Sequence, residues 1–259
     1  QYEELVSKAT PEQVRTINEA EIPGIYVMTA RGRQYPFNEL ASHVLGFTQQ
    51  QDKKTTAVGS YGIEAKYNSK LLEDSVTLTI EPKIQEKAED VLRRLVEEYQ
   101  PTAGTVIVQD PKTGKIVALG NYPTFDPNNY SGSPLSSFTN PAVQAVYEPG
   151  SIAKVLTMAA AIDAGAITPN TMYEDKGFYT ADGKTVKNWD LKAHGLISMT
   201  NVLEQSVNTG SVFAQQKMGR DAFYAYLLKF GFKEPTGIDL PGEVTGRLTP
   251  LEKYPRDIN

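Results

Sequence analysis

The stretch EPGSIAKVLTMAAAIDAG, residues 148–165, decides how the rest of this sequence is interpreted. Pro149 and Gly150 predict a turn, and the residues from Ser151 to Ala164 are apolar almost all round a helical projection. A helix with this pattern is enclosed by other elements rather than lying on a surface. Gly165 supplies its C-terminal stop. The sequence therefore predicts a buried helix that begins at Ser151.

Ser151 and Lys154 form an S-x-x-K pattern at the start of this helix. Residues three apart share one helical face, so the serine hydroxyl and the lysine amine are neighbours. In the first turn the serine oxygen lies near unpaired backbone N–H groups, which favour the negative charge that develops in acyl transfer. A lysine shielded from water can lose its proton and act as a base. Alone the pattern is weak, because a helical lysine usually extends into water.

A second polar motif, Ser206-Val207-Asn208, follows about 50 residues later. At a bend between helices, S-x-N can present a hydroxyl that relays protons and an amide that holds both the lysine and a substrate carbonyl. An ordinary helix cap or turn uses the same residue types. The order S-x-x-K then S-x-N nevertheless matches the serine acyl-transferases that include penicillin-binding proteins and class A β-lactamases. The candidate catalytic residues are therefore Ser151, Lys154, Ser206 and Asn208.

Regular elements are predicted on both sides of these motifs. Helical periodicity or helix-boundary signals indicate helices over 11–21, 37–45, 82–99, 198–205, 212–218 and 221–230, and β-rich runs indicate strands over 25–29, 76–80, 105–109 and 115–119. The last two strands flank Asp110-Pro111-Lys112-Thr113-Gly114, a connection typical of an antiparallel hairpin.

Composition narrows the classes of function. The chain has 259 residues, a net charge of -5 and no cysteine, and its pI is about 5.3. The acidic balance argues against nucleic acid as a partner, and the lack of cysteine excludes disulfides and thiolate metal sites. His43 and His194 are expected to be structural rather than catalytic or metal-binding. We expect no cofactor and no metal, and no stretch is apolar enough to span a membrane.

Further motifs resemble the class B penicillin-binding proteins. They are Arg33-Gln34-Tyr35-Pro36, Gly59-Ser60-Tyr61-Gly62-Ile63-Glu64, Thr79-Ile80-Glu81-Pro82-Lys83-Ile84-Gln85, residues 110–119 and Tyr147-Glu148-Pro149-Gly150-Ser151. The resemblance implies an α/β (α+β) penicillin-binding, or transpeptidase, fold with a central antiparallel sheet flanked by helices, incomplete at its C-terminus. Residues 1–75 would be part of a pedestal domain of the dimerisation type, and 76–259 the transpeptidase domain.

The same resemblance implies a serine D,D-transpeptidase that cross-links peptidoglycan. Ser151 would attack the D-Ala-D-Ala carbonyl of a stem peptide, Lys154 would take its proton, and Ser206 and Asn208 would complete the site. β-Lactams would acylate the same serine. Implied partners are a glycosyltransferase and other cell-wall synthesis proteins. The full-length protein would be anchored by an N-terminal helix on the outer face of the cytoplasmic membrane.

One family motif is missing from its expected place. The family has K-[ST]-G downstream of S-x-N, and residues 209–259 contain no match. Lys112-Thr113-Gly114 matches the K-[ST]-G pattern, but it precedes Ser151 and is predicted to form a hairpin turn. The chain is thus expected to be truncated before the third motif and nearly inactive by itself. Alternative readings are a D,D-carboxypeptidase or β-lactamase, and a penicillin-binding sensor or scaffold without cross-linking activity.

Overall fold

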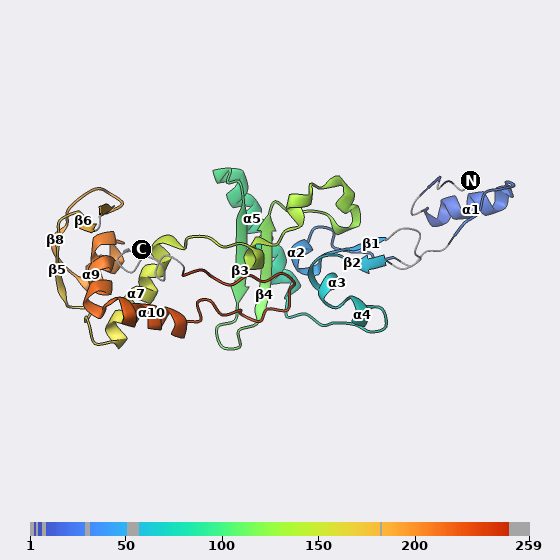
Figure 1. The fold of residues 1–259 in the computed structure, drawn as a ribbon. Coiled ribbons are helices and arrows are strands. Elements are labelled where there is room, and N and C mark those ends of the chain that lie inside the picture. Colours follow the sequence, from blue (N-terminus) through green and yellow to red (C-terminus); the bar gives the residue numbers. More distant parts are fainter. Residues whose placement is uncertain are drawn as a thin grey trace. The chain divides into compact units, whose positions relative to one another are not determined.

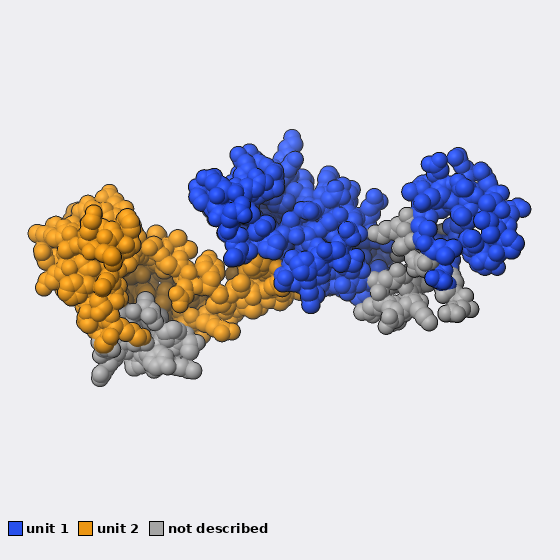
Figure 2. Space-filling view, turned by 90° about the horizontal axis from the view of Figure 1, so that it is seen from above, with its two compact units in different colours: residues 1–138 blue, residues 139–259 orange. Residues whose placement is uncertain are grey.

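The computed structural model describes residues 3, 5–6, 9–28, 32–50, 57–181 and 183–248. The chain divides into two compact units, residues 1–138 and 139–259 (Figure 2). In the first unit the helices are α1 (Pro11–Ala20), α2 (Ser42–Leu45), α3 (Gly62–Lys66), α4 (Asn68–Leu71) and α5 (Pro82–Tyr99), and the strands are β1 (Thr48–Gln50), β2 (Ala57–Gly59), β3 (Gly104–Gln109) and β4 (Ile116–Tyr122). Two 3₁₀ helices follow, η1 (Pro127–Gly132) and η2 (Leu135–Phe138).

The second unit carries both motifs (Figure 1). Its helices are α6 (Pro141–Gln144), the 3₁₀ helix η3 (Gly150–Ile152), α7 (Ala153–Asp163), α8 (Met199–Glu204), α9 (Asn208–Met218) and α10 (Arg220–Lys229), and its strands are β5 (Met172–Asp175), β6 (Phe178–Ala181), β7 (Lys184–Lys187) and β8 (Gly195–Ser198). Among the described residues the strands pair antiparallel as β1–β2, β3–β4, β5–β8 and β6–β7. This mixture of helices and antiparallel strands confirms the predicted fold class.

The hairpin β3–β4 forms as its turn residues predict, and α5 packs against it (Figure 1). The buried side chain of Gln85 on α5 joins the two elements. Its Oε1 accepts a hydrogen bond from the Leu119 N–H at 2.8 Å, and its Nε2 donates to the Leu119 carbonyl at 2.8 Å. The N–H and the carbonyl of Leu119 both point away from β3. The Gln85 side chain therefore supplies the hydrogen bonds that a neighbouring strand would otherwise make with Leu119.

Two of the motifs quoted from the first unit, residues 33–36 and 59–64, contact each other. Arg33 Nε is 2.9 Å from Glu64 Oε1. The hydroxyl of Tyr35 accepts from the Thr48 N–H at 3.0 Å, and its backbone N–H donates to Asn128 Oδ1 at 3.0 Å. These contacts connect the segment around residue 35 to α3, β1 and η1, so Arg33, Tyr35 and Glu64 have structural roles.

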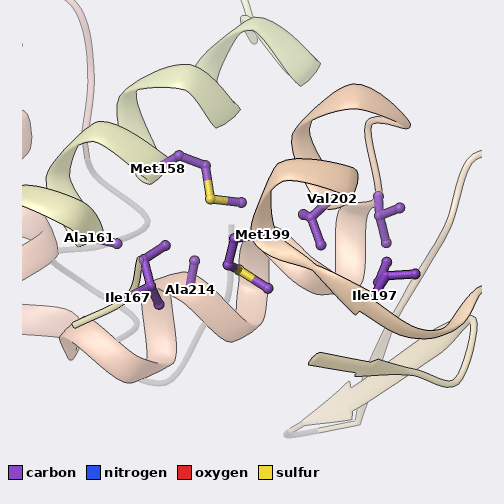
Figure 3. Packing of buried hydrophobic residues seen from close by; sticks show 8 residues of the cluster. Met158, Ala161, Ile167, Ile197, Met199, Val202 and Ala214 are labelled. Atoms are coloured by element: carbon purple, nitrogen blue, oxygen red, sulfur yellow. The ribbon is translucent and has the colours of Figure 1, made fainter. Parts of the chain in front are cut away.

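The core of the second unit lies between α7, α8 and α9. Met158 on α7 and Met199 on α8 project into the space between these helices (Figure 3). Gly210 lets α9 approach α8 closely, because an added Cβ would lie 2.4 Å from a methyl of the fully buried Val202. Buried apolar residues complete this cluster: Ala161, Ile167, Ile197, Val207 and Ala214. This packing fixes the positions of α7 and α9, the two helices that carry the motifs.

Several secondary-structure predictions are wrong. Residues 25–28 do not form the predicted strand, whose last residue, Thr29, lies outside the described part of the chain. Residues 36–41 form turns, so the predicted helix over 37–45 is limited to Ser42–Leu45. Residues 76–80 are not a strand either. This segment lies beside β4, where the Thr79 hydroxyl donates to the Ile116 carbonyl and the Glu81 N–H donates to the Val117 carbonyl. These two hydrogen bonds, one of them from a side chain, do not form the regular backbone pairing of a β-strand.

The expectation that the helix after Ser151 is enclosed on all sides is also wrong. Met158 and Ala161 are buried, but Ile152, Val155 and Ile162 are 65, 57 and 45% exposed. Among the described residues, nothing covers this second apolar side of the helix. The high hydrophobicity of the segment therefore does not by itself indicate complete burial here.

No helix within the described ranges is both long enough and apolar enough to cross a membrane.

Candidate active site

Ser151 lies at the start of the helical segment that Pro149 and Gly150 introduce. The segment opens as the 3₁₀ helix η3, and α7 continues it without a break from Ala153. Gly150 has a φ of +63°, and a Cβ added there would meet nothing within 4 Å. The backbone angle alone therefore favours glycine at this position. The turn leaves Ser151 exposed, which is the placement that a nucleophile needs to reach a substrate.

Lys154 links the two motifs. Its Nζ lies 3.2 Å from Ser151 Oγ, 2.9 Å from Ser206 Oγ, 2.6 Å from the Ser206 carbonyl oxygen and 2.6 Å from Asn208 Oδ1. Burial lowers the pKa of the Lys154 ammonium below its ordinary value of 10.5. A lowered pKa increases the fraction of neutral amine at a given pH, and the neutral amine is the form that can accept a proton.

The partners of Lys154 suit a neutral amine. A neutral amine has two N–H donors and one lone pair, whereas the ammonium has three donors. The Ser206 carbonyl and Asn208 Oδ1 can only accept hydrogen bonds, so they take both donors. The lone pair then remains for the O–H of Ser151 or Ser206. The arrangement can accordingly move a proton between the two hydroxyls through one nitrogen.

The S-x-N motif forms the bend between α8 and α9. Ser206 has a φ of +55°, an unusual left-handed conformation for a residue other than glycine. Val207 is fully buried and anchors the bend in the core. Asn208 begins α9, and its Nδ2 donates to the Lys187 carbonyl at 2.8 Å. Because Lys187 offers an acceptor and Lys154 offers a donor, the orientation of the Asn208 amide is fixed.

The structure brings together all four residues that the sequence singled out. Ser151 and Ser206 bond the same Lys154 nitrogen, and Asn208 completes the group. The helix that starts at Asn208 is four residues longer than the predicted segment, which began at Val212. Lys112 lies in the exposed turn between β3 and β4, as predicted, where its N–H donates to Asp110 Oδ1 at 2.9 Å. Among the described residues, no group of three or more His, Cys, Asp or Glu side chains could hold a metal ion.

A buried polar network next to the S-x-N motif was not predicted from the sequence. The carboxylate of Asp175, at the end of β5, is fully buried. Its Oδ1 accepts from Thr209 Oγ1 at 2.7 Å and from the Gly177 N–H at 2.9 Å. Its Oδ2 lies 2.7 Å from Asn188 Nδ2 and 2.7 Å from His194 Nδ1. Except for Gly177, these partners lie 13 to 34 residues from Asp175 in the sequence. A local sequence motif therefore cannot predict these contacts.

The contacts within this network shift the pKa values of Asp175 and His194. Burial alone would raise the pKa of Asp175, but hydrogen bonds from Thr209, Gly177 and His194 outweigh burial and lower it to about 2. The hydrogen bond to Asp175 raises the pKa of His194 above 6.5, and the charges of Asp190 and Asp175 add to this. His194 Nε2 is 3.1 Å from Asp190 Oδ2. The doubly protonated ring can donate to both carboxylates, whereas the neutral ring can donate to only one.

His194 should therefore make the free energy of unfolding depend on pH. A raised pKa in the folded protein gives a contribution that is fully present below pH 6.5 and is lost as pH rises through the folded-state pKa. We expect the stabilising effect of His194, relative to His194→Gln, to decrease as the pH rises above 6.5. Urea unfolding of both proteins at a series of pH values measures this difference. A difference that is constant or grows with pH would contradict the assignment of a charged His194.

Comparison with known proteins agrees with the geometry. The family model for the penicillin binding protein transpeptidase domain matches residues 104–258. The model for the penicillin-binding protein dimerisation domain matches residues 1–108. The chain belongs to the class B penicillin-binding proteins.

Named relatives are similar over most of this chain. Stage V sporulation protein D of Bacillus subtilis is 30% identical, with 95% of this chain and 42% of the relative covered. Peptidoglycan D,D-transpeptidase MrdA of Escherichia coli is 27% identical, covering 91% of this chain and 45% of the relative. Peptidoglycan D,D-transpeptidase FtsI of Escherichia coli is 24% identical, covering 93% of this chain and 44% of the relative. The chain thus spans less than half the length of these relatives.

Proposed function

We propose that this chain is the front part of a serine D,D-transpeptidase that cross-links peptidoglycan stem peptides through an acyl-enzyme on Ser151. The contact of Lys154 Nζ with both Ser151 Oγ and Ser206 Oγ carries the proposal. Two relatives named peptidoglycan D,D-transpeptidases support the choice of substrate.

In the proposed reaction, Lys154 takes the hydroxyl proton as Ser151 Oγ attacks the D-Ala-D-Ala carbonyl. The bond to the terminal D-alanine breaks, and Ser206 passes a proton from Lys154 to the departing amine. The amine of a neighbouring stem peptide then attacks the ester, forms the cross-link and returns the proton to Ser151. A β-lactam would acylate the same oxygen. Asn208 holds Lys154 in place and offers its amide to the substrate.

In the full-length protein we propose two domains and a further catalytic segment. Residues 1–75 would belong to the pedestal and 76–259 to the transpeptidase domain. A downstream segment would supply K-[ST]-G, one oxyanion N–H and the groups that hold the substrate carboxylate. Because each oxyanion donor contributes about 2.7 to 4 kcal/mol to transition-state stabilisation, the chain by itself would be nearly inactive. The full-length protein would act outside the cytoplasmic membrane, anchored by an N-terminal helix, with a glycosyltransferase as partner.

Product analysis of the full-length protein distinguishes this function from its alternatives. The protein is incubated with a D-Ala-D-Ala stem peptide and an acceptor amine, and the products are separated by mass spectrometry. We expect a cross-linked dimer that disappears when the acceptor is omitted. Hydrolysed peptide alone would indicate a D,D-carboxypeptidase. A stable acyl-enzyme with neither product would indicate a penicillin-binding sensor or scaffold. Either of these results would contradict the transpeptidase assignment.

A further inference from the structure

Asn208 and Thr209 bond two consecutive residues at the end of β7: Lys187, its last residue, and Asn188, which follows it. Asn208 Nδ2 donates to the carbonyl of Lys187. The Thr209 N–H donates to Asn188 Oδ1 at 3.3 Å, and Thr209 Oγ1 lies 3.1 Å from the same oxygen. The start of α9 is thus held against the segment around residue 188 by both its backbone and its side chains.

Asp175 connects both sides of this contact. Its two carboxylate oxygens accept hydrogen bonds from Thr209 Oγ1 and Asn188 Nδ2, each at 2.7 Å. Thr209, Asn188 and Asp175 are each only 1% exposed, so water does not compete for these bonds. A chain of direct contacts therefore runs from Asp175 through Thr209 to Asn208, and from Asn208 Oδ1 to Lys154 Nζ.

We infer that Asp175 and Thr209 are positioning residues of the acyl-transfer site, which fix Asn208 and the Ser206 carbonyl around Lys154. This inference rests on the proposed function, in which Lys154 is the base. It assigns a role to residues that touch neither Ser151 nor the substrate. A structural role alone would maintain folding, whereas a positioning role also sets the proton affinity of Lys154 and the rate of acylation.

The test compares Thr209→Val with Thr209→Ser. Valine keeps the branched shape but removes the hydroxyl that joins Asp175 to α9, and serine retains the hydroxyl. In the full-length protein we expect Thr209→Val to slow acylation by a fluorescent penicillin at least tenfold, and Thr209→Ser to restore it to within about threefold. The Ile167→Ala variant controls for lost stability, because Ile167 is buried in the apolar core of the same unit and its side chain has no group that could join the hydrogen-bond network.

A second measurement uses this chain itself and does not depend on catalysis. The pKa of Lys154 is obtained from the ¹³C shift of its Cε, assigned by its loss in Lys154→Ala. Loosening of Asn208 would admit water and raise this pKa toward its ordinary value. We expect the rise in Thr209→Val and no change in Thr209→Ser or Ile167→Ala. If Thr209→Val does not fold, Thr209→Ala is measured in its place.

The two measurements separate the inference from the proposed function. If the wild-type full-length protein is not acylated on Ser151, the proposed function is wrong, while a raised Lys154 pKa in Thr209→Val would still support positioning. If the wild type is acylated but Thr209→Val leaves both the rate and the Lys154 pKa unchanged, the inference is overturned. A loss of rate in Ile167→Ala equal to that in Thr209→Val would also overturn it, because stability would then explain the effect.

Discussion

Ser151→Ala should abolish covalent labelling of the full-length protein by a fluorescent penicillin. The label forms an ester with the serine oxygen, and alanine has no atom that can replace it. The matched control is Lys112→Ala, which changes the other candidate motif. Lys112 is exposed in a turn whose conformation depends on Asp110, since Asp110 accepts from the N–H of Lys112 and the hydroxyl of Thr113.

Lys112→Ala should accordingly leave labelling intact and change the free energy of unfolding by no more than about 0.5 kcal/mol, the usual range for surface sites. Gel fluorescence measures the first quantity and urea unfolding the second. A tenfold or greater loss of labelling in folded Lys112→Ala, equivalent to about 1.4 kcal/mol of transition-state stabilisation, would show that Lys112-Thr113-Gly114 takes part in the reaction.

Lys154→Ala should slow acylation roughly 10²–10⁴-fold, the usual contribution of a general base. Lys154→Arg should not restore the rate, because a guanidinium keeps its proton and cannot act as a base. Both variants retain Ser151, so stopped-flow measurement of the acylation rate reports the loss of the base directly. Circular dichroism at the same temperature checks that each variant is folded.

The control for Lys154 is Lys176→Ala, which removes an exposed lysine of the same unit. We expect it to react at the wild-type rate. A rate for Lys154→Arg close to that of the wild type would mean that a positive charge, rather than proton transfer, is what the reaction needs from this position.

Local patterns were sufficient for the elements whose signals are strong and regular. The helix over 82–99 was predicted with its observed bounds, because apolar and charged residues alternate with helical period and Pro82 begins it. The hairpin around residues 110–114 followed from its turn residues. The predicted strand over 76–80 failed because a run of β-favouring residues does not reveal whether a neighbouring strand is available to pair with it.

The sequence was sufficient to name the residues of the candidate site but not to show how they are arranged in space. The S-x-x-K and S-x-N motifs named Ser151, Lys154, Ser206 and Asn208, but their meeting at one nitrogen depends on how α7 packs against α9. The positioning network could not be predicted, since Asp175 bonds Thr209 across 34 residues and neither residue belongs to a motif. Local sequence thus identifies reactive groups better than the buried contacts that orient them.

If Ser151 is the nucleophile, a penicillin adduct must form on its side-chain oxygen. The full-length protein is incubated with benzylpenicillin, its intact mass is measured, and proteolytic fragments locate the modified residue. Opening of the β-lactam ring adds the whole molecule, so we expect a mass increase of one benzylpenicillin, located on Ser151. An adduct on another residue, or a folded protein that gains no mass, would show that Ser151 is not the nucleophile.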